Sequence, residues 1–275
     1  MISFALVIRI NMNRYSLISK ILDREVLLDI VVQDNDSEPG KPLKLIILND
    51  GQDADSFQLA QVMKETMATG IIKPTLAVAV HVGERKQEYG ISNRPDFAKR
   101  GSKAAFYASF IRQELLPWIY QHFNVSLEPK DRAIAGFSLG ALSAFDIAWH
   151  QSEIFGVAGL FSGSFWWRAK SLEEDYKPSD RIALQLVKDS KNKKELKFWF
   201  QTGWMDEHAD RDKDGLIDSI GDTLDLIREL KIKGYGVGKE IEYVEVGNGR
   251  HDHKTMARVF PKFLKWWQQN PNLQN

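Results

Sequence analysis

The chain has 275 residues, 43% of them hydrophobic, and its 37 lysine and arginine residues balance 37 aspartate and glutamate residues. A net charge of zero gives no overall field that would favour nucleic acid or an anionic membrane surface. Because the chain has no cysteine, disulfide bonds, thiolate nucleophiles and cysteine metal ligands are excluded.

The first ten residues, M-I-S-F-A-L-V-I-R-I, are apolar but interrupted by Arg9. They lack a basic leading region and a small-residue cleavage site, so we expect no signal peptide, and Met12 is an alternative start. No other segment approaches the roughly 20 apolar residues that span a bilayer. We therefore expect no membrane segment and a cytoplasmic protein, while a periplasmic or secreted location stays open.

Short β-branched runs alternate with longer helical patterns, and no linker, internal repeat or low-complexity tract divides the chain. This alternation predicts a single α/β domain over residues 1–275, with a mostly parallel sheet covered by helices. The predicted strands are Val26–Val32, Leu43–Leu48, Thr75–Val82, Ala133–Ala135, Val157–Phe161, Phe198–Thr202 and Ile241–Val246.

Helices are expected between these strands. The first begins with a Ser56 cap and runs to about Thr69, and the second spans Lys103–Phe123, with Pro117 bending or ending it. Further helices are expected from Leu139, over Leu216–Leu230 with an end at Gly234, and over about Lys254–Gln269. Segments 83–102 and 163–196 are predicted to be insertions that shape a pocket, the second of them lid-like.

Gly136, Ser138 and Gly140 form a G-x-S-x-G motif within the stretch 131–148. The motif alone is weak evidence, because glycine and serine are common residues. Its context is specific, since a short apolar strand leads in and an alanine- and leucine-rich helix leads out. A nucleophile elbow needs this arrangement, because its serine sits on a sharp strand-to-helix turn between small residues. We predict that Ser138 is a nucleophile rather than an idle turn serine, with the Leu139 N–H facing the developing oxyanion.

A second oxyanion donor is expected where the buried strand in L-I-I-L-N-D-G-Q-D, residues 45–53, ends. The Gln52 N–H is the candidate, and the alternative is a simple Asp-Gly turn with solvated side chains.

In an elbow-type site an acid and a histidine follow the serine in chain order, each after a later strand. The sequence W-M-D-E offers Asp206 or Glu207, and N-G-R-H-D-H offers His251 or His253. Of the other histidines, His122 and His150 lie at predicted helix ends, His81 precedes the serine, and His208 lies beside Asp206, so each is a weaker candidate for the base.

A second signal follows the candidate acid in D-R-D-K-D-G-L-I-D, residues 210–218. The pattern departs from the EF-hand loop, because its twelfth position is Gly221, and is closer to shorter D-x-D-x-D-G calcium loops. We expect either a structural calcium ion that stiffens this loop or a solvated acidic turn. The candidate calcium ligands are Asp210, Asp212, Asp214, the Leu216 carbonyl, Asp218 and Asp222.

Several stretches together resemble the putative esterase family of α/β-hydrolases, which includes siderophore esterases, feruloyl esterases, S-formylglutathione hydrolase and mycolyltransferases. The stretches are L-N-D-G-Q at 48–52, E-L-L-P-W-I at 114–119, G-F-S-L-G-A-L-S-A at 136–144, F-S-G-S-F-W-W at 161–167, Q-T-G-W-M-D-E at 201–207 and G-R-H-D at 249–252. The resemblance covers about residues 13–270. Its S-G-S-F-W-W stretch is most similar to the siderophore-esterase and related bacterial branches.

The resemblance implies an α/β-hydrolase fold, with a mostly parallel central sheet and helices on both faces, and a serine-dependent carboxylic ester hydrolase. It assigns the nucleophile to Ser138, the acid to Asp206 and the base to His251, while Glu207 stays an alternative acid. Ala141 stands where the family commonly has a second glycine. The implied partner is a small-molecule ester, aryl, siderophore-like or sugar-linked, and this chemistry requires no cofactor. The oligomeric state stays open.

Phe165, Trp166 and Trp167 follow a predicted strand end, and Trp204 lies just before the candidate acid. We predict that these four residues form the walls of a site that prefers aryl or other bulky esters, and the alternative is that they pack a lid internally. Two other functions remain open. An acyltransferase would use the same triad with an alcohol in place of water, and a ligand-binding domain without activity would require a broken triad, which the sequence does not show.

Overall fold

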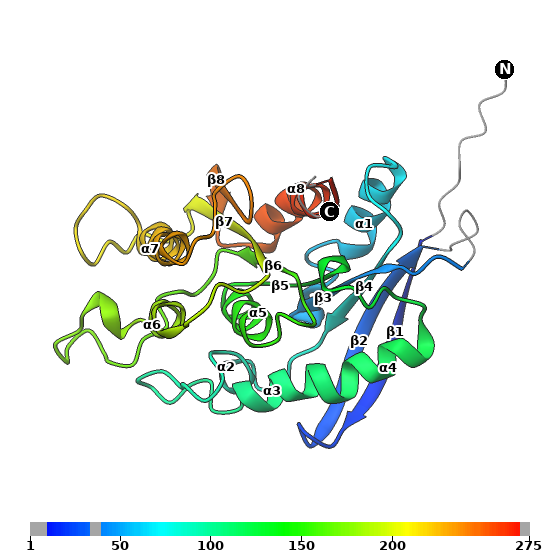
Figure 1. The fold of residues 1–275 in the computed structure, drawn as a ribbon, viewed down its shortest axis with the longest axis horizontal. Helices are drawn as coiled ribbons and strands as arrows, with labels where there is room; N and C mark the ends of the chain where they lie inside the picture. Colours follow the sequence, from blue (N-terminus) through cyan, green and yellow to red (C-terminus); the bar gives the residue numbers. More distant parts are fainter. Residues whose placement is uncertain (1–9, 34–39, 270–275) are drawn as a thin grey trace.

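The computed structural model describes residues 10–33 and 40–269, so the predictions for the first nine residues lie outside the described part. In that part eight strands form one sheet, in the order β1-β2-β4-β3-β5-β6-β7-β8 (Figure 1). The strands are β1 (Ile10–Ser19), β2 (Arg24–Gln33), β3 (Lys44–Asn49), β4 (Thr75–Val80), β5 (Arg132–Phe137), β6 (Val157–Phe161), β7 (Lys197–Met205) and β8 (Ile241–Arg250). β1 pairs with β2, and β2 with β4, in the antiparallel direction. From β4 onward in this order, each strand pairs with the next in the parallel direction. The mostly parallel sheet that the sequence predicts is confirmed.

The central strands consist almost wholly of apolar residues because helices cover both of their faces. Every residue of β3, β4, β5 and β6 is buried, as expected for parallel strands in the middle of a sheet. The seven predicted strands are all present, with ends that differ by a few residues. Strand β1 was not predicted, because it is an edge strand with mainly exposed residues and carries no strong apolar pattern.

Two layers of helices enclose the sheet (Figure 1). On one face lie α1 (Leu59–Ala68) and α8 (His253–Gln269), whose apolar sides form one buried cluster with that side of the sheet. The other face is covered by α3 (Ala104–Phe110), α4 (Leu116–His122), α5 (Leu139–His150), α6 (Ile182–Asp189) and α7 (Asp218–Ile232), which contribute to a second, larger cluster. The central strands of the sheet are therefore buried from both sides.

Two expected helix boundaries differ from the structure for local reasons. Ser56 does not cap α1, because a 3-10 turn, η1 (Gly51–Asp53), comes first and the helix starts after Gln58, which has a left-handed φ of 56°. The expected helix over 103–123 is divided by a π turn, η2 (Ile111–Leu115), between α3 and α4, and it does not end at Pro117 as the sequence analysis allowed. Pro117 lies in the first turn of α4, where its missing N–H costs little.

The two predicted insertions pack against each other. Segment 83–102 carries the short helix α2 (Arg85–Glu88), and segment 163–196 carries the 3-10 turn η4 (Pro178–Asp180) and α6. The Phe97 N–H donates to the Arg168 carbonyl at 3.0 Å, and the Trp167 indole donates to the Arg94 carbonyl at 3.2 Å. The segment predicted to be lid-like is thus anchored by a buried tryptophan.

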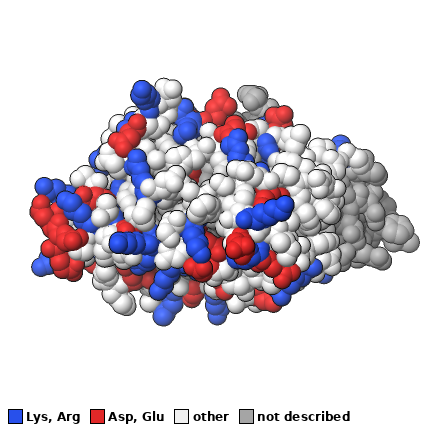
Figure 2. Space-filling model, turned by 90° about the horizontal axis from the view of Figure 1, so that it is seen from below, with Lys and Arg blue, Asp and Glu red and all other residues white. Residues whose placement is uncertain are grey.

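Basic and acidic side chains are interspersed on the face shown in Figure 2, as the balanced composition predicts. No helix within residues 10–33 and 40–269 has the length and apolar character needed to cross a membrane.

Candidate active site

Ser138 connects β5 to α5 in a sharp turn. Its backbone has φ 58° and ψ −120°, a conformation that residues with a side chain rarely adopt. The Ser138 N–H donates to the Phe161 carbonyl at 3.0 Å, and the Ala141 N–H donates back to the Ser138 carbonyl at 3.1 Å. The turn is therefore held on both sides, and Ala141 is accommodated within it.

The two glycines of the motif are explained by close contacts, one with backbone atoms and the other with a side chain. A Cβ on Gly136 would lie 2.4 Å from the backbone of Gly140, and a Cβ on Gly140 would lie 2.7 Å from Oδ2 of Asp50. No real Cβ fits at such distances, so the strand and the helix can meet at Ser138 only with glycine at both positions.

The Ser138 hydroxyl is half-buried and lies 3.2 Å from the hydroxyl of Ser164. Ser164 is buried in the loop after β6, and its N–H donates to the Ser138 carbonyl at 3.2 Å. This neighbour was missed by the sequence analysis. The repeated serine in F-S-G-S, directly after a strand, was its only signal.

The two proposed oxyanion donors lie on segments that are bonded to each other. Leu139 is the first residue of α5, so its N–H has no partner within the helix. Gln52 lies in η1, directly after β3, and its side chain bonds to Asp50 and to the Val82 N–H. The Asn49 side chain connects the two segments, because its Nδ2 donates to the Gly140 carbonyl at 2.7 Å.

Asp206 follows β7 at the same edge of the sheet. The Gly203 N–H donates to its Oδ2 at 3.0 Å, while Oδ1 is buried without a hydrogen-bond partner. Burial raises the pKa of Asp206, against the opposing effects of this hydrogen bond, the Ser162 hydroxyl and the charge of His251. The close approach explains Gly203, since a Cβ there would lie 2.6 Å from Oδ1 of Asp206.

His251 follows the end of β8, and its ring packs against the ring of Phe137 with centroids 4.5 Å apart. Phe137 directly precedes Ser138, so the imidazole lies at the elbow. The histidine is exposed, yet partial desolvation of its ring lowers the pKa of His251, and the charge of Asp206 acts in the opposite direction. Among the described residues, no hydrogen bond joins the side chains of Ser138, Asp206 and His251. Such bonds are often long in enzymes without substrate.

The alternative acid and base have other partners. Glu207 lies in the loop after β7, where burial raises its pKa against the opposing effect of the Ser219 backbone in the first turn of α7. His253 lies 3.5 Å from Asp53 of η1. Of the remaining histidines, His81 bonds to Asp29, His122 to the Trp118 carbonyl, and His150 approaches Asp146, while His208 is exposed.

Two of the four aromatic residues predicted to line the site do not reach its surface. Phe165 is 1% exposed and packs on Phe145 and Phe200, and Trp167 is fully buried between the insertions. The prediction that these two contact substrate is wrong, because both belong to the core. Trp166 is half-buried and Trp204 is 59% exposed, so both remain accessible.

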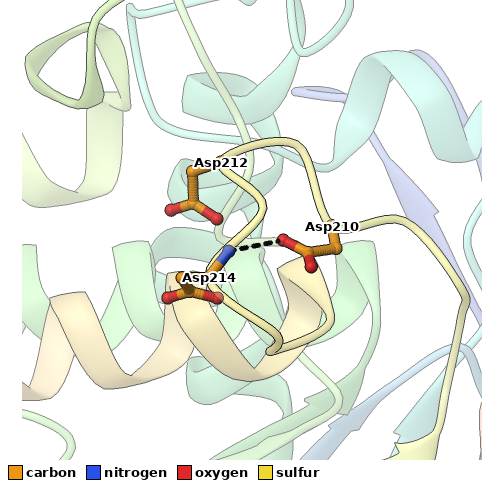
Figure 3. Close-up of side chains that lie close together, drawn as sticks. All are labelled: Asp210, Asp212 and Asp214. Atoms are coloured by element: carbon orange, nitrogen blue, oxygen red, sulfur yellow. Dashed lines mark hydrogen bonds between the residues drawn. The ribbon is translucent and has the colours of Figure 1, made fainter.

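The predicted calcium ligands separate into two groups. The carboxylates of Asp210, Asp212 and Asp214 gather within 4.8 Å of one another in the loop before α7, and the Asp214 N–H donates to Asp210 (Figure 3). Asp218 instead pairs with Arg211 at 3.3 Å.

Asp222 belongs to a different arrangement. It lies inside α7, fully buried, and its carboxylate pairs with Arg181 and Arg211. Asp222 therefore does not belong to the acidic cluster of the loop.

A basic residue beside the elbow was not predicted from the sequence. Arg85, at the start of α2, forms two hydrogen bonds to Asp50 and one to the Phe137 carbonyl. Nothing in the sequence indicates that a cation in an insertion makes such a contact. The polar Asn49 and Asp50 at the end of a buried strand indicated only that this strand end is functional.

Comparison with known proteins identifies the family and the fold of the chain. The model of a family described as putative esterase matches residues 19–265. Among curated proteins, the chain is 24% identical over 170 residues to the uncharacterized protein YbbA of Bacillus subtilis, covering 62% of each chain. It is 31% identical over 103 residues to an endo-1,4-beta-xylanase/feruloyl esterase of Xylanibacter ruminicola, covering 37% of this chain and 13% of that protein. The chain thus spans less than two thirds of both relatives.

Solved structures share the fold. A ferulic acid esterase superposes with a TM-score of 0.72 at 16% identity, covering 95% of this chain and 99% of that one. The enterobactin esterase of Shigella flexneri gives 0.74 at 20% identity, covering 94% and 59%. The S-formylglutathione hydrolase of Staphylococcus aureus gives 0.67 at 15% identity, covering 94% and 99%. These structures show the α/β-hydrolase type of fold. Because the family model extends over most of the chain, from β1 to α8, the chain belongs to the putative esterase family.

Proposed function

We propose that this protein is a serine-dependent carboxylic ester hydrolase in which Ser138 is the nucleophile, His251 the base and Asp206 the acid. The observation that carries the proposal is the strained Ser138 at a strand-to-helix elbow, with the ring of His251 packed on Phe137, the residue directly before it. Family membership supports the ester chemistry. The names of the similar structures, ferulic acid esterase and enterobactin esterase, support it further.

The proposed reaction has two acyl-transfer steps. His251 takes the proton of Ser138 as the hydroxyl attacks the ester carbonyl, and Asp206 stabilises the imidazolium that forms. The N–H groups of Leu139 and Gln52 stabilise the oxyanion of the tetrahedral intermediate. Protonated His251 then gives its proton to the leaving alcohol. Water, deprotonated by His251, hydrolyses the acyl-enzyme and restores Ser138. These groups supply all the proton transfers and charge stabilisation, so the proposal includes no cofactor in catalysis.

Asp206 is preferred to Glu207 as the acid because its charge acts directly on the pKa of His251. Glu207 is instead engaged by the backbone at the start of α7. We expect Asp206→Asn to reduce kcat strongly and Glu207→Gln to have a small effect. The reverse ranking would transfer the role of the acid to Glu207.

For the substrate we propose a small-molecule ester with an aromatic part. Trp166 and Trp204 present accessible aromatic surface, and the similar esterases are named for ferulic acid and enterobactin. A panel of acetyl, feruloyl and catechol-type esters tests this preference. Equal kcat/KM on all three would contradict it, and product analysis with added alcohols separates hydrolysis from acyl transfer.

The decisive experiment combines labelling with kinetics. A fluorophosphonate probe should label the wild-type protein at Ser138, and Ser138→Ala should remove both the label and ester turnover, by as much as about a million-fold. His251→Ala should cause a comparable loss, while the matched variant His253→Ala should retain most activity. Near-wild-type turnover by a folded Ser138→Ala variant would contradict the proposed nucleophile.

We further propose that the loop around Asp210, Asp212 and Asp214 binds a structural calcium ion. The D-x-D-x-D-G spacing supports this, and so does the gathering of the three carboxylates (Figure 3). The ion would restrict the loop that directly follows Asp206.

A further inference from the structure

The end of β3 is bonded to two other parts of the protein. On one side, Nδ2 of Asn49 donates to the Gly140 carbonyl at 2.7 Å. On the other side, the Tyr107 hydroxyl donates to Oδ1 of Asn49 at 2.8 Å, and the Asp50 N–H donates to the Tyr89 hydroxyl at 2.8 Å. Segment 49–52, which we call the oxyanion loop, is thus fixed between the elbow and segment 83–107.

The side chain of Asp50 occupies an unusual position for a carboxylate. The residue is 7% exposed and has a left-handed φ of 63°. Its Oδ2 lies so close to Gly140 that a Cβ there would be 2.7 Å away. The carboxylate is therefore next to Leu139 and two residues from Gln52, whose N–H groups are proposed to face the developing negative charge. A carboxylate without a counter-ion at this place would oppose the charge of the oxyanion.

Arg85 supplies the counter-ion. Its Nε donates to Oδ1 of Asp50 at 2.8 Å and its Nη2 to Oδ2 at 2.9 Å, a two-point contact that only a guanidinium makes. The same Nη2 lies 3.2 Å from the Phe137 carbonyl, directly before the nucleophile. The guanidinium also lies over the Tyr89 ring, 5.6 Å from its centroid. One side chain therefore contacts both the oxyanion loop and the strand that carries Ser138.

We propose that Arg85 is a positioning residue, which neutralises Asp50 and holds the oxyanion loop against the elbow so that both N–H donors face one oxyanion. This inference rests on the proposed function. Arg85 itself contacts neither substrate nor the reacting atoms in this assignment.

The position of Arg85 also affects the proposed base. The charged and titratable groups that act on His251 are Asp206 from the end of β7, Asp252 and His253 from the start of α8, and Arg85 from α2. The two carboxylates raise the pKa of His251, and Arg85 and His253 lower it. Removal of the Arg85 charge should therefore raise the pKa of His251 and move the acid limb of the kcat/KM profile to higher pH.

The experiment compares Arg85→Gln, Arg85→Lys, Asp50→Asn and the double variant Arg85→Gln/Asp50→Asn. The matched control is Arg24→Gln, because Arg24 makes a similar two-point contact with Glu88 of the same helix, at 2.9 and 2.6 Å, without touching the elbow. Arg85→Gln should lower kcat about 10- to 100-fold, less than the full loss of an oxyanion donor. Arg24→Gln should lower it much less at a similar loss of stability.

The double variant provides the sharpest test. If Asp50 without its counter-ion opposes the oxyanion, Arg85→Gln/Asp50→Asn should recover part of the kcat that Arg85→Gln loses. Arg85→Lys retains the charge, so its acid limb should stay near that of the wild type. A double variant no faster than Arg85→Gln, or equal losses in Arg85→Gln and Arg24→Gln, would overturn the inference and leave Arg85 a purely structural residue.

Labelling separates the failure of this inference from the failure of the proposed function. Without fluorophosphonate labelling of the wild type at Ser138, the proposed function fails and the inference with it. If the wild type is labelled and active but Arg85→Gln behaves as the wild type, only the role of Arg85 is refuted.

Discussion

The backbone conformation of Ser138 leads to a prediction about stability that can be tested without a substrate. A φ of 58° with ψ of −120° lies in a region that glycine adopts freely and that costs other residues about 1–3 kcal/mol. Ser138→Gly should remove this strain, whereas Ser138→Ala should retain it. Both variants lose the nucleophile, so they differ in stability and not in activity.

The expected difference in the free energy of unfolding between these two variants follows from three contributions. Both variants lose the 3.2 Å contact with the Ser164 hydroxyl, a long bond that contributes about 0.5 kcal/mol, so it cancels in the comparison. Relative to Ser138→Ala, relief of strain should stabilise Ser138→Gly by about 2 kcal/mol. The greater freedom of its unfolded chain should destabilise it by about 1 kcal/mol. Ser138→Gly should therefore be about 1 kcal/mol more stable than Ser138→Ala.

The measurement is urea unfolding followed by circular dichroism and tryptophan fluorescence, with equal slopes required for both variants. Ser143, which is buried inside α5, provides the control. There Ser143→Gly should be about 1 kcal/mol less stable than Ser143→Ala, because glycine is unfavourable in a helix. If glycine is also the less stable replacement at Ser138, the position is not strained and the elbow geometry is wrong.

Three further predictions concern the core, the base and the acidic loop. Phe165→Ala should destabilise the fold by about 3–5 kcal/mol, while Trp204→Ala should cost about 1 kcal/mol or less, and equal effects in urea unfolding would contradict their assigned burial. The acid limb of kcat/KM should lie below the ordinary histidine pKa of about 6.5, because desolvation lowers the pKa of His251, and a limb above that value would contradict this. Calcium at a hundredfold excess over its dissociation constant should stabilise the protein by about 2.7 kcal/mol, and Asp212→Ala with Asp214→Ala should abolish the effect. Calorimetry without calcium binding, and melting curves unchanged by a chelator, would refute the calcium site.

The parts of the molecule that sequence alone predicted are those whose geometry is local. The elbow depends on a strand, a serine and a helix that are adjacent in the chain, and Gly136 is required by contacts within those few residues. Gly140 instead faces Asp50, which is distant in the sequence. The buried strands were recognisable because residues covered on both faces must be apolar. Chain order indicated the loops that carry Asp206 and His251, since parallel strands end at one edge of the sheet.

Directions of side chains and distant partners were not predictable in the same way. Phe165, Trp166 and Trp167 all follow a strand, but only the fold determines that the first and third point into the core. Arg85 lies 35 residues from Asp50, and no periodicity in the sequence marks such a pair.

The role of Asp222 leads to the last prediction. The sequence pattern made it a candidate calcium ligand, but its buried carboxylate pairs with Arg181, from the start of α6, and with Arg211, from the acidic loop. Burial raises the pKa of Asp222 in spite of both cations. Arg181 also pairs with Asp225 and Arg211 with Asp218, so Asp222 is the buried centre of a charge network. Removing one member of a buried ion pair costs about 3–5 kcal/mol, because the other charges remain buried. Asp222→Ala should therefore destabilise the protein by about this amount and increase hydrogen exchange in residues 207–217, equally with calcium and with a chelator. A loss of stability that appears only when calcium is present would instead make Asp222 a ligand.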